Sequence, residues 1–279
     1  MGKVILFLLM VLILGSYLYL SRPYWFYSPT TSAMSVDKIG YQESPSKLLK
    51  EAKEFLKARK DSAALTNFAK VLATAPNDIN ALWGKAEILR RARKYTEAKE
   101  ILEQILRNNP KHAPSILTLA FIQYLEGKLN DAQKTLKGVF ENSTDKENHA
   151  MAFMIIGAIN AKRAESGFIL SKLKNATQIR CYFERAKELA PDVPEIRLAL
   201  GTFYMNAPAV LGGNMERALT ELTAAVEMAP DFATANARLA QYYRKKGDFQ
   251  KYTRYIERAE YLDPGSDIIA EVKNQDPFR

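Results

Sequence analysis

Cysteine and histidine are scarce in this sequence, which limits the chemistry that it can support. Among its 279 residues there is one cysteine, Cys181, and there are two histidines, His112 and His149. One cysteine forms neither an intrachain disulfide nor a multi-cysteine zinc site, and we expect it to be a small, half-buried side chain. The histidines stand in or beside predicted turns without Cys, Asp or Glu at metal-ligand spacing, so we interpret them as surface residues. We predict no metal site, no cofactor and no Cys–His nucleophile.

Motifs of common catalytic sites are also missing. The sequence contains no GxSxG, HExxH, phosphate-binding P-loop or GxGxxG. Gly212 and Gly213 precede a predicted helix and could hold an anion on free N–H groups, but a tight turn that caps the helix is the better interpretation. With 13 glycines and 12 prolines, the chain is neither collagen-like nor of low complexity. We therefore predict that the protein is not an enzyme.

Charge of one sign is not concentrated enough to indicate a nucleic-acid-binding surface. The net charge is +9, but the 40 basic residues are interspersed with 31 acidic residues. Such a balance is compatible with nucleic acid, anionic lipid or acidic partners. We favour a solvated or lipid-facing surface and expect no nucleic acid as a partner. The densest basic run consists of Lys47, Lys50, Lys53, Lys57, Arg59 and Lys60.

One long hydrophobic run is present, near the start of the chain. Residues 4–20 form 17 consecutive positions without a charge, of which twelve are Leu, Ile, Val or Phe. Such residues favour bilayer insertion by roughly 4–6 kcal/mol in total, and at about 1.5 Å per residue the run spans about 26 Å, close to a bilayer core. The run exceeds a typical signal-peptide core, and the aromatic residues 24–27 follow it as at a membrane interface. We favour an uncleaved single-pass anchor, with a cleavable signal peptide as the alternative.

The orientation of this anchor and the domain boundaries follow from the flanking residues. Lys3 favours an inside N-terminus and an exported, periplasmic domain, whereas the basic run from Lys47 would favour the cytoplasm. No cysteine follows the run directly, which excludes a bacterial lipoprotein. We divide the chain into a short tail at 1–3, a transmembrane signal anchor at 4–21, a linker at 22–44, a repeat domain at 45–264 and a C-terminal capping helix or tail at 265–279.

A period of 34 residues dominates the rest of the sequence. Pro76 and Pro110 are separated by this interval, and so are Pro230 and Pro264. A small residue stands twelve positions before the proline, a large apolar residue eight before, and another small or apolar residue five before. This pattern predicts pairs of antiparallel helices in close contact. The clearest sets are Ala64, Phe68 and Val71; Ala98, Leu102 and Ile105; and Ala218, Leu222 and Ala225, with Ala132, Leu136 and Val139 in the same register.

Helix ends and insertions complete the pattern. Gly127 and Gly247 stand where the first helix of a pair should end, as C-terminal caps. Six units fit the period, but the fourth carries about 13 extra residues near 166–177 and the fifth about five near 206–214. We therefore expect local departures from a regular array at these two places.

This pattern resembles the tetratricopeptide-repeat (TPR) family. The resemblance implies an all-α superhelical solenoid of about six helix-turn-helix repeats that binds other polypeptides in its concave groove. The stretch 203–218 is similar to a variant of exported bacterial members, including subunits attached to some tripartite ATP-independent periplasmic transporters. Those subunits are typically lipoproteins, and this chain lacks the lipidation cysteine. The family's carboxylate clamp is also missing, because its positions hold Leu49 with Lys53 and Trp83 with Glu87.

The first helix of each unit would line that groove, with positions 5, 9 and 12 of the unit pointing inward. The groove is then apolar and aromatic in its middle and positive at its two ends, at Lys53 and Arg244. An extended peptide or amphipathic helix with an apolar face and acidic flanks would fit it. The alternative is that many of these residues pack on neighbouring helices. The candidate partner-binding residues are Trp83, Glu87, Arg90, Leu117, Phe121, Tyr124, Met151, Ile155 and Met205.

Three functions remain open from the sequence. The leading hypothesis is a membrane-anchored scaffold that recruits or organises an envelope complex. The second is a structural protein that self-associates, for which molecular size would depend on concentration. The third is an accessory subunit of a transport system or an enzyme with a small-molecule pocket, for which a ligand would raise the melting temperature. The choice among them rests on likeness of fold rather than on a site.

Overall fold

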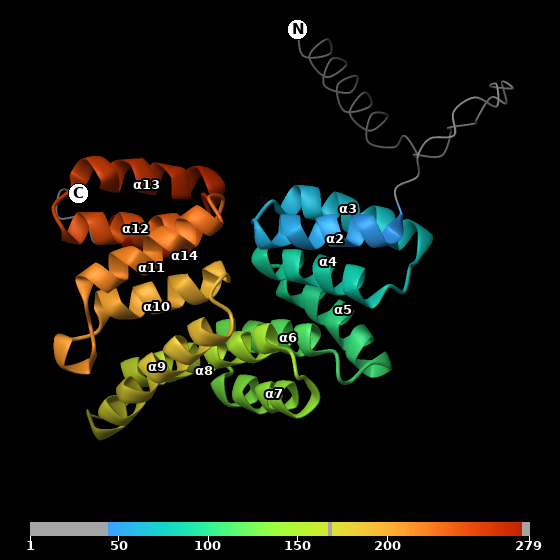
Figure 1. Ribbon diagram of the computed structural model, residues 1–279, viewed down its shortest axis with the longest axis horizontal. Helices are drawn as coiled ribbons and strands as arrows, with labels where there is room; N and C mark the ends of the chain where they lie inside the picture. Colours follow the sequence, from blue (N-terminus) through green and yellow to red (C-terminus); the bar gives the residue numbers. More distant parts are fainter. Residues whose placement is uncertain (1–43, 167–168, 275–279) are drawn as a thin grey trace, which may run out of the picture. The chain divides into compact units, whose positions relative to one another are not determined.

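The computed structural model describes residues 44–166 and 169–274, with side chains described for 44–165 and 178–274. The predicted anchor, nearly all of the predicted linker and the last five residues lie outside this range. Within it the chain is all-α and contains no strand. Figure 1 shows the helices following one another along a curved array. They are α2 (Pro45–Lys57), α3 (Asp61–Thr74), α4 (Ile79–Arg91), α5 (Tyr95–Asn108), α6 (Ala113–Leu125), α7 (Leu129–Asn142), α8 (Lys146–Ser166), α9 (Ile169–Leu189), α10 (Pro194–Asn206), α11 (Met215–Met228), α12 (Ala233–Lys245), α13 (Phe249–Leu262) and α14 (Asp267–Asn274).

Local sequence explains where several of these helices begin. Ser44, Asp78, Asn214 and Asp248 are N-cap residues whose side chains accept a hydrogen bond from the backbone N–H three residues later. Such bonds satisfy donors that the first helical turn leaves unpaired. Proline stands in the first turn of α2, α6 and α10, where no N–H is needed.

The predicted small and large positions form the interior of the solenoid. Ala64, Ala98, Ala132 and Ala218 are fully buried. They let the two helices of a pair approach closely, and the large residue four positions later fills the space between pairs. The sequence pattern had not singled out Gly84, although a Cβ there would overlap the ring of Phe68. The predicted all-α solenoid is confirmed.

The two insertions take different forms. The fourth unit becomes a pair of long helices, because α8 and α9 each have 21 residues where most others have 13 or 14. The fifth adds the short 3₁₀ helix η1 (Ala209–Leu211), followed by Gly212 in the left-handed conformation at φ 98°. A Cβ on Gly213 would collide with the carbonyl oxygen of Ala207, so this turn requires glycine.

Besides Gly212, four residues in the described turns inside the helix pairs have left-handed backbone. Gly127 and Gly247 have φ of 79° and 75°, as expected of C-terminal caps. Arg59 and Arg93 occupy the corresponding positions after α2 and α4, with φ of 63° and 60°. An arginine is strained in this conformation, which costs about 1–2 kcal/mol, so these two turns carry a cost that glycine would avoid.

None of the helices in the described ranges is both long enough and apolar enough to cross a lipid bilayer. The predicted span at 4–21 is not among those ranges.

Candidate protein-binding channel

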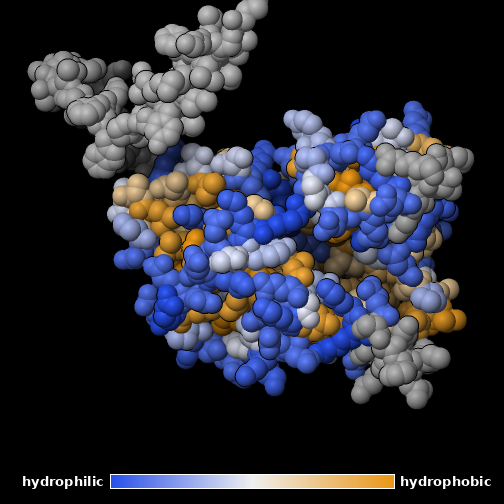
Figure 2. All heavy atoms as spheres, turned by 180° about the vertical axis from the view of Figure 1, so that it is seen from behind, coloured by the Kyte–Doolittle hydropathy of each residue, from blue (hydrophilic) through white to orange (hydrophobic). Residues whose placement is uncertain are grey.

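The concave side of the solenoid encloses an open channel with a volume of about 2090 Å³. Residues from α2 to the first turn of α14 line it, so both ends of the array contribute to the same space. Figure 2 shows the surface hollowed near the middle of the helical part. A channel of this size exceeds the usual range of small-molecule pockets, about 300–1,000 Å³.

Helix α6 supplies an apolar surface inside the channel. None of its 13 residues carries a charge. A helix that is apolar all round is normally buried on every side. Here Leu117, Phe121 and Tyr124 line the channel, and the last two remain half-exposed. The rings of Phe121 and Tyr124 are stacked with their centroids 5.7 Å apart. We call these three residues the aromatic shelf.

Cations flank the shelf and hold its aromatic rings in place. The guanidinium of Arg90 lies 4.6 Å from the ring centroid of Phe121, and the ammonium of Lys162 lies 5.4 Å from that of Tyr124. Burial, followed by the nearby charge of Glu165, raises the pKa of the Tyr124 hydroxyl. The shelf therefore presents neutral rings with fixed orientations, which suits contact with apolar side chains of a partner.

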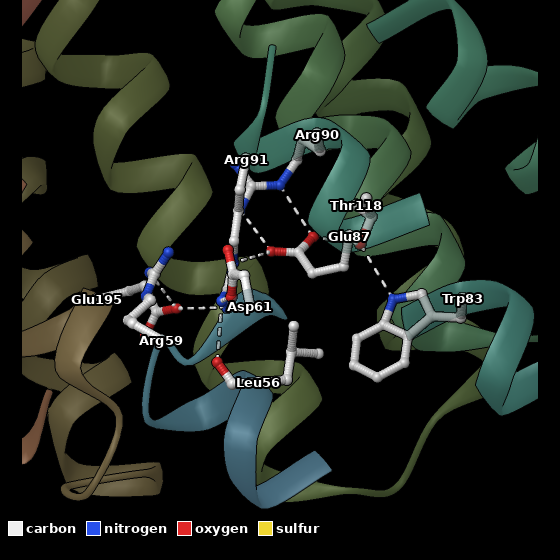
Figure 3. A network of polar contacts seen from close by, with 9 residues as sticks. All are labelled: Leu56, Arg59, Asp61, Trp83, Glu87, Arg90, Arg91, Thr118 and Glu195. Carbon is white, nitrogen blue, oxygen red and sulfur yellow. Dashed lines mark hydrogen bonds and ion pairs between the residues drawn. The ribbon is translucent and has the colours of Figure 1, made fainter. Parts of the chain in front are cut away.

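Beside the shelf, Glu87 is the centre of a buried polar network (Figure 3). It accepts hydrogen bonds from Arg90 Nε at 2.9 Å, Arg91 Nε at 3.2 Å and Thr118 Oγ1 at 3.1 Å. Trp83 Nε1 in turn donates to Thr118 Oγ1 at 3.1 Å. Burial alone would raise the pKa of Glu87, but Arg90 and Arg91 outweigh it and lower that pKa to about 2. The carboxylate stays ionised and fixes both arginines.

Arg91 carries this network toward the far side of the channel. Its Nη1 donates to Asp61 Oδ1 at 2.6 Å and to the carbonyl oxygen of Leu56 at 2.9 Å, and its Nη2 lies 3.9 Å from Glu195 Oε1. Burial lowers the pKa of Arg91, but Glu87 and Asp61 more than compensate, so the pKa is raised. Arg91 thus remains charged between three carboxylates.

Arg59 reaches from the turn after α2 to the C-terminal half of the solenoid. Its Nη2 donates to Glu195 Oε1 at 2.6 Å, and its guanidinium lies 3.8 Å from the ring centroid of Phe232. The side chain is only 10% exposed. Burial, and then the charge of Arg91, lowers the pKa of Arg59 to about 10, and its Nε is buried without a hydrogen-bond partner among the described residues. The basic run had suggested a solvated or lipid-facing residue, which is wrong for Arg59.

Arg93 makes a second contact of the same kind from the turn after α4. Its Nη2 and Nη1 donate to the two carboxylate oxygens of Asp263 at 2.7 and 3.3 Å. Asp263 lies between α13 and α14, 170 residues away along the chain. We call the Arg59–Glu195 and Arg93–Asp263 ion pairs together the clasp. Both arginines are those with left-handed backbone.

A row of lysines lies at the α2 side of the channel. Lys53 donates to Asn80 Oδ1 at 2.9 Å. Lys50, Lys57 and Lys60 line the channel and are exposed, and no residue in the described ranges pairs with them. This side therefore carries positive charge that is available to a partner.

The structure places most of the predicted partner-binding residues in the channel. Trp83, Glu87, Arg90, Leu117, Phe121, Tyr124, Met151 and Ile155 all line it. Met205 does not: it is 5% exposed and packs in the core, while its neighbours on α10 face the channel. At this position the side chain packs against neighbouring helices instead of facing the channel, as the alternative interpretation of the sequence allowed.

Three other expectations need correction or refinement. Arg244 does not line the channel, and its guanidinium donates to the carbonyl oxygen of Val272, so it does not supply the positive charge expected at the second end. Cys181 is exposed rather than half-buried. His112 and His149 are half-buried and hydrogen-bonded, to Ser115 Oγ and to a backbone carbonyl. No cluster of metal-ligating residues occurs within the described ranges.

Sequence reasoning missed the clasp. Its partners are 136 and 170 residues apart, far beyond any repeat period. A local signal did exist: arginine stands at two turn positions where the related turns hold Gly127 and Gly247. A residue that accepts backbone strain where glycine would fit indicates that its side chain is needed.

Two family models described as tetratricopeptide repeat match the chain, one at residues 55–111 and 89–152 and the other at 209–267. Together they span more than half of it. A DnaJ homolog subfamily C member 7 homolog of Dictyostelium discoideum is 21% identical over 205 residues, which are 73% of this chain and 37% of that protein. This chain thus spans little more than a third of that relative's length.

Solved structures show the same fold. A human IFIT1 dimer with PPP-AAAA aligns with a TM-score of 0.55 and 18% identity, over 83% of this chain and 53% of that one. The APC/C hetero-tetramer Cut9-Hcn1 aligns with a TM-score of 0.55 and 14% identity, over 85% and 43%. At these identities the likeness concerns the fold alone. With the repeat period, the helix pairs and the matching family models in agreement, this chain belongs to the tetratricopeptide-repeat family.

Proposed function

We propose that the protein is an interaction scaffold that binds a polypeptide segment in its channel. The aromatic shelf carries this proposal, because it is an apolar surface that the fold leaves half-exposed inside a concave space. Proteins of this repeat family generally mediate protein–protein interactions. Half-exposed aromatic rings next to arginine are the residue types that contribute most to binding energy at protein interfaces.

The charges in the channel indicate the chemistry of the segment. Lys50, Lys57 and Lys60 offer unpaired positive charge on the α2 side, and the aromatic shelf follows two helices further along the array. A segment with apolar residues over the shelf and acidic residues over α2 complements both features. Acidic flanks at both ends, as expected from the sequence, are no longer required, because Arg244 does not line the channel.

A polypeptide suits this channel better than a nucleic acid does. Nucleic-acid sites are strongly positive, since affinity comes from phosphate neutralisation. The channel lining contains ten basic and ten acidic side chains. Most of its arginines are already paired with carboxylates, including Arg90, Arg91 and Arg93. The remaining positive charge is restricted to the lysine row.

We further propose that residues 4–21 anchor the solenoid to a membrane and that the solenoid is exported. The support is the uncharged run of 17 residues and the aromatic cluster that follows it. An anchor would place the channel at one membrane surface, where it recruits or organises an envelope complex. Protease protection of the solenoid in intact cells and in spheroplasts tests this orientation directly.

Site-specific photo-crosslinking tests the channel proposal. A photoreactive phenylalanine analogue replaces Phe121 in the full-length protein in its native cells, and cross-linked segments are mapped by mass spectrometry. Phe140 is the matched control, because it is also an exposed phenylalanine but lies on α7 outside the channel. We expect Phe121 to capture a segment of another protein in which apolar residues adjoin acidic ones.

Three outcomes would contradict the proposal. Equal capture at both positions would show that the channel has no special role. Capture only of a second copy of this chain would favour self-association instead of recruitment. Capture of segments without the expected apolar and acidic residues would refute the assigned partner chemistry.

A further inference from the structure

We propose that the clasp holds the channel closed and must part before a polypeptide can enter. This inference rests on the proposed binding function and concerns its regulation. In the closed state, the Arg59–Glu195 and Arg93–Asp263 pairs join the two halves of the solenoid across the channel. A partner without a free end at the channel mouth can reach the aromatic shelf only after these pairs separate.

Apart from the clasp, the 3.9 Å contact between Arg91 and Glu195 also joins the two halves, and it too is made by side chains alone. Extensive helix packing in the described ranges joins only helices that are adjacent, or one apart, in chain order. The hydrophobic cluster of α2–α4 contains no residue from α10–α14. The apolar side chain of Phe232 meets the clasp through the guanidinium of Arg59. Closure therefore depends on side-chain contacts that can break without disturbing a core.

Arg59 shows that the closed state carries unfavourable features at the contact itself. Its Nε is buried without a hydrogen bond among the described residues, and two other arginines lie in the same buried network. Its backbone is left-handed, but this conformation belongs to the turn itself, as at Gly127 and Gly247, so its cost remains when the clasp opens. Opening would return Nε to water. The cost of burying Nε opposes the attraction of Glu195 and Phe232, so the closed and open states are closer in free energy than a buried ion pair alone would suggest.

Arg93 repeats this combination in an exposed setting. Its backbone is also left-handed, and its pair with Asp263 is 43% and 34% exposed. Exposed ion pairs contribute little and exchange readily with water. The two turns that lack glycine are thus the two whose side chains close the channel.

The clasp also shares the polar network that supports the binding surface. Glu195 lies near Arg91, Arg91 binds Glu87, and Glu87 binds both Arg90 and Thr118 (Figure 3). Arg90 in turn contacts the ring of Phe121. A partner that moves Arg90 or Phe121 would therefore act on groups in direct contact with the clasp.

Cysteine labelling measures entry into the channel without requiring a known partner. Thr202 lines the channel, and Thr202→Cys in the full-length protein places a thiol there. The exposed Cys181 lies outside the channel and serves as an internal control. Labelling rates are compared for N-ethylmaleimide and for a bulky reagent that carries its maleimide at the branch point of a two-armed polyethylene glycol, so that the maleimide cannot enter as a free chain end. The opened variant carries Arg59→Gly and Arg93→Gly in addition, which also remove the backbone strain and so favour folding of both turns.

If the clasp controls entry, the bulky reagent labels the thiol introduced by Thr202→Cys at least ten times faster in the opened variant. The small reagent labels this thiol at similar rates in both proteins, and Cys181 is labelled equally throughout. Equal rates of bulky labelling in the closed and opened proteins would overturn the proposal. This result does not depend on any partner, so it is distinguishable from failure of the photo-crosslinking experiment.

A matched pair of charge variants controls for local effects. Asp263→Asn breaks a clasp pair, whereas Asp231→Asn breaks the Arg258–Asp231 pair, which has the same exposures of 43% and 34% but joins neighbouring elements. Only Asp263→Asn should increase the rate at which the bulky reagent labels the thiol introduced by Thr202→Cys. Exchanging the two charges, Arg93→Asp with Asp263→Arg, should restore the ion pair and slow this labelling again. Equal effects of the two asparagine variants would show that the clasp is not a gate.

Discussion

The buried carboxylate of Glu87 allows a quantitative test of the network beside the aromatic shelf. Its pKa is lowered from an ordinary value of 4.5 to about 2. At 1.36 kcal/mol per unit, this difference corresponds to about 3 kcal/mol of stability near pH 7. The value agrees with the roughly 3–5 kcal/mol lost when one partner of a buried ion pair is removed. We therefore expect Glu87→Gln to lower the free energy of unfolding by about 3 kcal/mol.

The pH dependence fixes the sign of this effect. A carboxylate with a lowered folded-state pKa stabilises the protein above its unfolded-state pKa, and this contribution is lost as pH falls toward the folded-state pKa. The difference in the free energy of unfolding between the wild type and Glu87→Gln should thus have its full value above about pH 5. It should shrink as the pH falls from 4.5 to about 2.

Urea unfolding followed by circular dichroism at several pH values measures both proteins. Glu188→Gln is the control, since the Arg185–Glu188 pair is 56% and 63% exposed and such pairs contribute at most about 1 kcal/mol. A loss below about 1 kcal/mol for Glu87→Gln at pH 7, or a difference that persists unchanged at pH 2, would refute the assigned role of Glu87.

Packing, backbone strain and charge each give one further prediction. Gly84→Ala should lower the free energy of unfolding in urea by about 1–3 kcal/mol, because its Cβ would overlap the buried ring of Phe68. Gly138→Ala, whose Cβ has room, should instead raise the free energy of unfolding by up to about 1 kcal/mol. Arg93→Gly should change stability by less than about 1 kcal/mol, because relief of the left-handed strain offsets the lost exposed ion pair; a larger loss would show that the pair contributes more than its exposure implies. Replacing Lys50, Lys57 and Lys60 by glutamate should weaken binding of the cross-linked acidic segment at least ten times, as measured by fluorescence anisotropy. The same replacement of Lys134, Lys137 and Lys146, which are exposed but do not line the channel, should leave the binding unchanged.

The sequence was sufficient to predict the repeats because their determinants are local. Ala98 and Leu102 lie within one helix, and burial of both follows from the spacing that brings them to one face. The inward positions of α4 and α6 were predicted for the same reason. On α10 the prediction failed at Met205, because the rotation of that helix depends on how it packs after the long α8–α9 pair.

The clasp could not be predicted in the same way. Whether Arg93 meets Asp263 depends on the rotation accumulated over all intervening repeats, and a small change in each repeat would separate the two residues by many ångströms. The sequence carries the chemistry of each partner but not this accumulated geometry. In the sequence, such a contact is indicated locally by arginine at two turn positions where a left-handed backbone favours glycine.

Closure of the array also bears on how the protein unfolds. A linear repeat protein can fray from either end, since each repeat contacts only its neighbours. Contacts between residues 59 and 195 and between residues 93 and 263 give the terminal repeats partners at both sides. They also introduce contacts of very long sequence separation, which slow the last step of folding. The two arginines thus link the first repeats to the last ones, so that the array unfolds more cooperatively than a linear one. Before the repeats at either terminus can fray, they have to break their ion pairs with the repeats near the other terminus.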